Sequence, residues 1–306
     1  MDRASQTSMR PWHEGELEVQ ERAGVRQEAD ELSGMYRRQI PAAMAGFLSQ
    51  QQFAVLSTAD ENGRVWANLI AGQPGMLDVR SLNQIVLLPG NIETSLPTAD
   101  VQHDPAVGLI VIDFSRRIRA RINGSAHIEE DGSIALTIAQ FYGNCSQYIQ
   151  RRVIEESSLD KPGANSGVSH TLSASQREMI ERADTFFIAS RHPTHGADAS
   201  HRGGKPGFVQ GAAPERISFP DYPGNKMFNT LGNIAVNPAV GLLFVDFESG
   251  RTLQVSGRAR VDWDRDRSAK FDMAQRVVDV QVEEVRDTEH ATSLRYRFIG
   301  YSPTLE

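Results

Sequence analysis

Short apolar runs separated by glycine, proline and polar turns dominate the chain from residue 53 onward. Their length and their punctuation are typical of β-strands. Parallel βαβ units would need a helix between successive strands, and this pattern shows few helices there. The chain is therefore predicted to be mainly β, with helices at the flanks and small antiparallel barrels as its architecture. The predicted strands cover residues 53–57, 64–71, 84–88, 107–114, 118–128, 134–141, 185–190, 217–219, 240–247, 252–261, 277–285 and 294–299.

Helices are predicted mostly at the edges of these strand groups. Apolar positions at helical spacing indicate a helix over residues 26–49, which Pro41 breaks or restarts. Residues 1–25 are polar and are predicted to form an arm outside the core. Other predicted segments are a helix over 145–155, a short helix ending at Ala183, a long polar loop over 191–206, and a turn and helix from Pro223.

The strand pattern occurs twice, 133 positions apart. Residues 104–114 reappear as residues 237–247, and Gly124 aligns with Gly257 at the same offset. A duplication of this length predicts two domains of one fold, each too large to be a solenoid repeat. The predicted organisation is an N-terminal arm and helix at 1–40, a first barrel at 41–155, a breaker-rich linker at 156–175 and a second barrel at 176–306.

Composition narrows the partners of this chain of 306 residues. Its formal net charge of −7 and the lack of a long basic run argue against nucleic acid. There is no apolar run of membrane-spanning length, and the polar N-terminus does not resemble a signal peptide. The single cysteine, Cys145, excludes an intrachain disulfide and fits a reducing compartment. We therefore expect a cytoplasmic protein with no nucleic-acid or membrane partner.

Two polar segments of the second copy hold the candidate chemistry. In 198–208 and 220–233, glycines allow a ligand to approach the backbone closely. Ser200 and Arg202 in the first segment, and Asn225 and Lys226 in the second, are donors suited to a phosphate. A helix start at Gly224 would add free amide donors and the positive end of the helix dipole.

Comparing the two copies assigns this chemistry to one of them. The first copy has Leu69 and Ile70 near the position of Arg202, and Ile92 near that of Lys226. The first barrel is therefore predicted to have a degenerate site and to serve as a wall of the second. A solvated turn is the alternative interpretation of these glycine-rich polar segments.

These residues resemble a known family, the pyridoxamine 5'-phosphate oxidase-like, FMN-binding split-barrel proteins. The resemblance lies in residues 200–208, 220–226, 237–244 and 253–259. Residues 63–67 and 143–150 look like the tandem subgroup of that family. The resemblance covers roughly residues 40–300 and implies two tandem split β-barrels with FMN in a cleft between two barrels. These two barrels could be the two copies in one chain or could belong to two chains. The resemblance also implies an oxidoreductase and, as is common in the family, a homodimer.

The resemblance carries over to particular residues. It implies that Ser200, Arg202, Asn225 and Lys226 hold the ribityl phosphate. The implied neighbours of the flavin are Gly203 and His201 beside the phosphate motif, the segments containing Val209, Gln210, Asn229 and Asn233, and Cys145 and Tyr148 from the other copy. Arg151 or Arg152 is placed to reach the N1 side of the flavin. The arginine and lysine residues that hold pyridoxal phosphate in the best-known oxidase have no match here, so that substrate is not implied.

The histidines and the cysteine can be interpreted as structural residues as well as functional ones. His192, His195 and His201 fit no helical metal-ligand spacing and no cysteine joins them, so no metal is predicted and loop histidines are the alternative. Cys145 lacks a second cysteine for a dithiol couple, and a small core residue is the alternative to a flavin contact.

The predicted function is hydride or electron transfer through FMN. The partner would be a small-molecule substrate or a reduced nicotinamide, and direct hydride transfer needs no general acid or base. The alternative is a non-catalytic flavin or haem carrier module. A structural protein with a vestigial site is a third class, which the presence of Arg202 and Lys226 speaks against.

Overall fold

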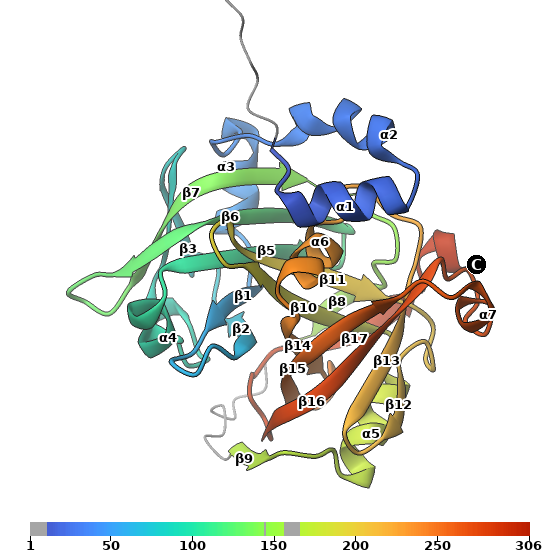
Figure 1. Cartoon of the computed structure of the whole chain (residues 1–306). Helices are drawn as coiled ribbons and strands as arrows, with labels where there is room; N and C mark the ends of the chain where they lie inside the picture. The colour runs from blue at the N-terminus through green and yellow to red at the C-terminus, as the bar shows by residue number, and fades with distance from the viewer. Residues whose placement is uncertain (1–10, 144, 156–165) are drawn as a thin grey trace, which may run out of the picture.

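The computed structural model describes residues 11–143, 145–155 and 166–306 (Figure 1). Two strongly curved antiparallel sheets lie against each other, and short helices flank them (Figure 1). The α-helices are α1 (Glu14–Arg22), α2 (Arg26–Glu31), α3 (Ala42–Ser49), α4 (Thr98–His103), α5 (Ala174–Arg182), α6 (Asn229–Val236) and α7 (Arg265–Ser268), and the 3-10 turns are η1 (Ser33–Met35), η2 (Pro89–Asn91) and η3 (Pro303–Leu305). In this part of the chain no helix is long and apolar enough to span a membrane.

The first sheet is built from the first copy of the repeat, and its strand order is β2-β1-β5-β6-β7-β4-β3. Its strands are β1 (Phe53–Ala59), β2 (Val65–Ala71), β3 (Leu77–Ser81), β4 (Gln84–Leu87), β5 (Ala106–Asp113), β6 (Ile118–Ile128) and β7 (Ile134–Gly143). Alternate residues such as Leu56, Leu109 and Ile122 point inward and form the core of this barrel.

The second sheet repeats this topology, with the order β11-β10-β14-β15-β16-β13-β12. Its strands are β9 (Ser166–Ser169), β10 (Thr185–His192), β11 (Gly196–Gly203), β12 (Gln210–Ala213), β13 (Arg216–Asp221), β14 (Ala239–Val245), β15 (Thr252–Asp262) and β16 (Arg276–Thr288). Each strand from β10 to β16 thus has a counterpart at the same place in the first sheet, which confirms the predicted duplication and the mainly β, tandem split-barrel fold. The predicted linker at 156–175 lies outside the described residues as far as 165, and β9 then pairs with β16.

The paired glycines Gly124 and Gly257 show why the two copies share particular residues. Each lies at a β-bulge, between β6 and β7 in the first barrel and between β15 and β16 in the second. A Cβ atom would come within 2.0 Å of the Thr137 carbonyl oxygen at Gly124 and within 2.2 Å of the Gln281 carbonyl oxygen at Gly257. The bulge therefore requires glycine in both copies.

The two barrels pack face to face through equivalent surfaces. At Gly108 on β5, a Cβ atom would lie 2.6 Å from the Cα of Asp198 on β11; at the equivalent Gly241 on β14, it would lie 2.6 Å from the Val65 carbonyl oxygen on β2. The equivalent rings of Phe114 and Phe247 meet with their centroids 5.2 Å apart. A shared apolar cluster fills this interface. One chain therefore supplies both halves of a pseudo-symmetric pair of barrels.

The helix predicted over residues 145–155 is wrong. Residues 145–150 form an irregular turn, and β8 (Arg151–Glu155) follows as a strand that pairs with β17 (Arg295–Gly300). Its residues Val153 and Ile154 are β-branched and suit a strand. This two-stranded ribbon joins the end of the first copy to the end of the second.

The predicted polar arm is also wrong for residues 11–25, because α1 packs against α6 (Figure 1). A Cβ atom on Gly15 would lie 2.1 Å from the Gly232 carbonyl oxygen, so the two helices touch backbone to backbone. The amide of Gln20 donates to the Met227 carbonyl at 3.0 Å. The polar residues of α1 can be buried because they form hydrogen bonds with buried groups of the second barrel.

Candidate functional site

A cavity of about 630 Å³ lies between the two barrels. Its walls come from β6 and the turn after β7 in the first barrel, from β11 and the 220–231 segment in the second, and from the end of α1. Nine of the predicted site residues line it: Cys145, Tyr148, Ser200, His201, Arg202, Gly203, Asn225, Lys226 and Asn229. The other three, Val209, Gln210 and Asn233, do not.

The lining is strongly basic although the whole chain carries a net charge of −7. The basic side chains in it are Arg22, Arg119, Arg121, Arg202, Lys226, Arg265 and Arg276. Among the described lining residues, Asp221 is the one carboxylate, and it accepts a hydrogen bond from Arg276 Nε at 2.9 Å. A cavity of this kind favours an anionic ligand.

The second-barrel wall is formed by β11, which was predicted as part of a polar loop. This prediction is wrong: Ser200, His201 and Arg202 lie on a strand and are hydrogen-bonded in register to β10. Arg202 has a buried Nε atom with no partner in the part of the chain that the structure describes, and burial lowers the pKa of its guanidinium. The Ser200 hydroxyl donates to Asp198 at 3.4 Å and accepts from Thr230 at 3.1 Å. Arg202 therefore has donor capacity to spare, whereas Ser200 is already bonded.

Gly203 is needed for the close approach of the other barrel. A Cβ atom there would lie 2.0 Å from the carbonyl oxygen of Tyr148. The Tyr148 ring stacks on Tyr222 at 5.2 Å, and its hydroxyl donates to the Pro223 carbonyl at 2.9 Å. The turn after β7 is thereby held against the second barrel. Cys145 is exposed in the same turn, rather than being a core residue.

The 223–228 segment differs from the predicted helix start. α6 begins at Asn229, so the amides of Gly224 and Asn225 are not at a helix N-terminus. Lys226 and Phe228 adopt left-handed conformations, with φ of 60° and 62°. Lys226 is half exposed, and its ammonium group lies 3.6 Å from Glu28 on α2.

Two lining arginines come from the first barrel and were missed by the sequence analysis. Arg119 and Arg121 are two positions apart on β6, so their side chains lie on the same face of the strand, which is turned toward the second barrel. Arg121 makes a buried ion pair with Asp198, which also accepts from the Tyr142 hydroxyl at 3.0 Å. The positions aligned with them are Thr252 and Gln254, so the comparison of copies that singled out Arg202 contained this signal as well.

Asn229 and Asn233 connect the cavity floor to α1. The Asn229 amide donates to Glu16 at 2.6 Å and to Tyr36 at 2.5 Å, and its buried Oδ1 atom has no partner within the described part of the chain. The Asn233 Oδ1 atom lies 3.0 Å from His13 Nε2. Asn229 therefore borders the cavity, whereas Asn233 binds the helix.

The remaining predicted residues lie elsewhere. Val209 is part of the apolar core of the second barrel, and Gln210 is exposed at the start of β12. Arg152 pairs with Asp184 at 2.5 Å, and Arg151 donates to the Ser115 carbonyl at 3.2 Å. Neither arginine lines the cavity. The first-barrel cations at this site are Arg119 and Arg121 instead.

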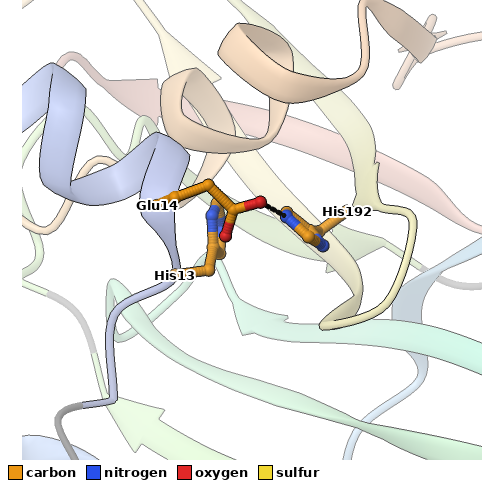
Figure 2. Close-up of side chains that lie close together, drawn as sticks. All are labelled: His13, Glu14 and His192. Atoms are coloured by element: carbon orange, nitrogen blue, oxygen red, sulfur yellow. Dashed lines mark hydrogen bonds and ion pairs between the residues drawn. The ribbon is translucent and has the colours of Figure 1, made fainter.

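A second polar cluster lies where α1 meets β10, and Figure 2 shows its members His13, Glu14 and His192. The Nδ1 atom of His13 accepts from the Gly15 N–H, and that of His192 accepts from the backbone N–H groups of residues 194 and 195. A neutral ring with an accepting Nδ1 carries its hydrogen on Nε2. His13 Nε2 therefore donates to Asn233, and His192 Nε2 donates to Glu14 at 3.0 Å. With Nε2 protonated, neither ring directs a lone pair toward the centre of the cluster. The side chains of His13, Glu14 and His192 instead hold α1 against β10, and we call them the α1 clasp.

We expect two buried groups at the start of α1, His13 and Glu16, to have opposite effects on how stability changes with pH. Burial lowers the pKa of His13 to about 4 and raises the pKa of Glu16 to about 7. As pH falls from 6.5 to 5, the unfolded chain takes up the His13 proton, which destabilises the fold, and the folded chain takes up the Glu16 proton, which stabilises it.

Conservative variants should separate the two contributions. Relative to the wild type, Glu16→Gln should lose about 1–2 kcal/mol of unfolding free energy between pH 6.5 and 5, and His13→Asn should gain about as much. Melting temperatures measured across this range check the result. Variant and wild-type curves that stay parallel would contradict these protonation states.

The fold and the cavity define a tandem split-barrel protein with a basic site between its barrels. The chain belongs to the pyridoxamine 5'-phosphate oxidase family: the model of that family matches residues 40–161 and again residues 172–297. This confirms the resemblance inferred from the sequence, in both copies. No curated protein matches the chain at a significant level.

Solved structures similar to this chain each cover about one barrel of it. HupZ of Group A Streptococcus is 12% identical, with 40% of this chain and 99% of that chain covered and a TM-score of 0.32. A putative pyridoxamine 5'-phosphate oxidase from Lactobacillus delbrueckii is 20% identical, with coverage of 38% and 94% and a TM-score of 0.32. The FAD binding protein from Mycobacterium smegmatis is 17% identical, with coverage of 40% and 98% and a TM-score of 0.29.

Proposed function

We propose that this chain is an FMN-binding flavoprotein that acts as an oxidoreductase, with FMN in the cavity between its barrels. The observation that carries the proposal is the basic lining of that cavity in an otherwise acidic chain. A volume of about 630 Å³ lies within the usual range for cofactor sites. The Nε atoms of Arg202 and Arg119, which have no partner in residues 11–143, 145–155 and 166–306, fit a ligand with a phosphate group.

Each group of lining residues has its own role in this proposal. Arg202, which is partly buried, provides the positive charge for the phosphate, and Lys226 and Asn225 border the cavity from the 223–228 segment. Tyr148 and Cys145 contribute the wall from the first barrel, and α1 closes another side through Arg22. When bound, FMN supplies hydride acceptance and donation, so the protein has to bind it, orient it and admit a donor. A reduced nicotinamide or a similar small molecule is the donor that we propose.

The purified chain tests this directly. We expect a yellow protein that binds one FMN per chain and is bleached without oxygen by NADH or NADPH. Since both walls of the cavity come from one chain, binding should not depend on protein concentration, whether or not the proposed homodimer forms. Colourless protein that ignores added FMN would contradict the proposal. Bound FMN that no donor reduces would favour a carrier module over an enzyme.

A further inference from the structure

His201 is held by an arginine from the opposite barrel. The Arg119 Nη1 atom lies 2.9 Å from His201 Nδ1. A guanidinium group has donors and no acceptor, so Nδ1 must be the acceptor in this bond. The hydrogen of the neutral imidazole then has to be on Nε2. Arg119 thereby determines the tautomer of a residue that is 82 positions away in the sequence.

The Nε2–H group of His201 lacks an acceptor. His201 is 4% exposed, lines the cavity, and has no hydrogen-bond partner at Nε2 within the described residues. Buried donors are nearly always satisfied, so an orphaned one at a cavity indicates a ligand. Burial and then the charges of Arg119, Arg202 and Arg152 hold the pKa of His201 well below its usual range. The ring therefore stays a neutral donor.

The groups around His201 indicate the charge of that ligand. Arg119 and Arg202 each have a buried Nε atom that has no hydrogen-bond partner among the described residues. Burial lowers the pKa of Arg119 to about 9, with the charges of Arg121 and Arg202 as further causes. The nearby carboxylate of Asp198 is already engaged by Arg121 and by Tyr142. Three donors thus line the cavity, whose one described carboxylate, Asp221, already accepts a hydrogen bond from Arg276; this excess of donors fits an oxyanion.

We propose that Arg119, His201 and Arg202 form one oxyanion subsite across the two barrels, in which Arg119 positions the Nε2–H group of His201 toward a phosphate oxygen of the ligand. The assignment of that oxygen to the FMN phosphate rests on the proposed function. It makes the first barrel a direct participant in phosphate recognition, although its own copy of the site is degenerate.

Comparing FMN with riboflavin, which lacks the phosphate, tests the contact. His201→Phe should weaken FMN binding about tenfold or more and leave riboflavin binding unchanged. His201→Gln retains an N–H donor and should recover most of the loss. His127→Phe is the matched control, because His127 is exposed on the same strand as Arg119 and lies outside the cavity. Equal losses for FMN and riboflavin, or no loss for either, would overturn the phosphate contact.

Histidine nitrogen NMR tests the subsite without flavin. His201 should remain neutral with its hydrogen on Nε2 from pH 8 to pH 5, and Arg119→Leu should release the ring to titrate or to change tautomer. Inorganic phosphate should shift the Nε2 resonance in the wild type. If the wild type fails to bind FMN but phosphate still moves this resonance, the subsite stands and the proposed function falls. A protonated ring, the opposite tautomer, or no response to phosphate would overturn the subsite.

Discussion

Arg202→Leu is expected to raise the dissociation constant for FMN at least 100-fold. The variant removes a charge-assisted donor set from the cavity, and such bonds to phosphate contribute about 1.5–3 kcal/mol each. It also installs the residue found at the aligned position in the first copy, Leu69. The same change should leave the flavin-free protein as stable as before or about 1 kcal/mol more stable, because the buried Nε atom of Arg202 has no partner among the residues that the structure describes. Flavin fluorescence titration and thermal melts without flavin measure the two effects.

Lys205→Leu is the control for this experiment. Lys205 is an exposed cation of the same segment and does not line the cavity. Its loss removes the same formal charge and should change FMN affinity less than about threefold, since screened surface charges contribute little. An Arg202→Leu variant that binds FMN as tightly as the wild type would remove Arg202 from the phosphate site. Equal losses in both variants would reduce its role to long-range attraction.

The fold was predictable because the same strand pattern occurs twice in the sequence. Apolar strand runs at one offset indicated two like barrels, and pairs such as Gly124 and Gly257 coincide because the same bulge needs glycine in each. Local patterns carry this information, since a strand's alternation and a bulge's steric demand act over a few residues. The order of strands in the two sheets does not follow the order in the sequence, since β1 pairs with β5 and β4 with β7, but it is the same in both copies.

The errors lie where local pattern and tertiary surroundings disagree. β11 looked like a loop because its side chains are polar, yet Asp198, Ser200 and His201 are buried, and His201 and Arg202 line the cavity. α1 looked like a free arm because the partners of its buried polar residues, such as Asn229 for Glu16, are more than 200 positions away. Neither contact has a local signature, so propensity and periodicity miss both.

The sequence analysis predicted the cations that the second barrel contributes to the candidate site and missed those of the first barrel. Arg202 and Lys226 stood out because the first copy lacks them, and both line the cavity. Arg119 stands out by the same comparison in the opposite direction, since the second copy has Thr252 there. The premise that one copy kept the site and the other lost it concealed this second set. Both barrels contribute basic residues to the lining of the cavity, Arg119 and Arg121 from the first and Arg202 and Lys226 from the second.

The buried ion pair between Arg121 and Asp198 joins the two halves. Arg121 lies on β6 of the first barrel and Asp198 on β11 of the second, and both are nearly inaccessible to solvent. Asp198 also accepts from Tyr142 of the first barrel and from Ser200 beside the cavity. Its carboxylate therefore satisfies donors from both barrels at their contact.

Asp198→Ala should lower the free energy of unfolding by about 3–5 kcal/mol, because it leaves the Arg121 charge buried without its carboxylate. Glu129→Ala is the control, since its pair with Arg80 at 2.6 Å is partly exposed and should contribute under about 1 kcal/mol. Replacing the pair by apolar residues, in Arg121→Met with Asp198→Leu, should recover much of the loss. Urea unfolding of the four proteins checks the series. If Asp198→Ala is no more destabilising than Glu129→Ala, the pair does not hold the barrels together, and the joint must come from the apolar cluster around Phe114 and Phe247.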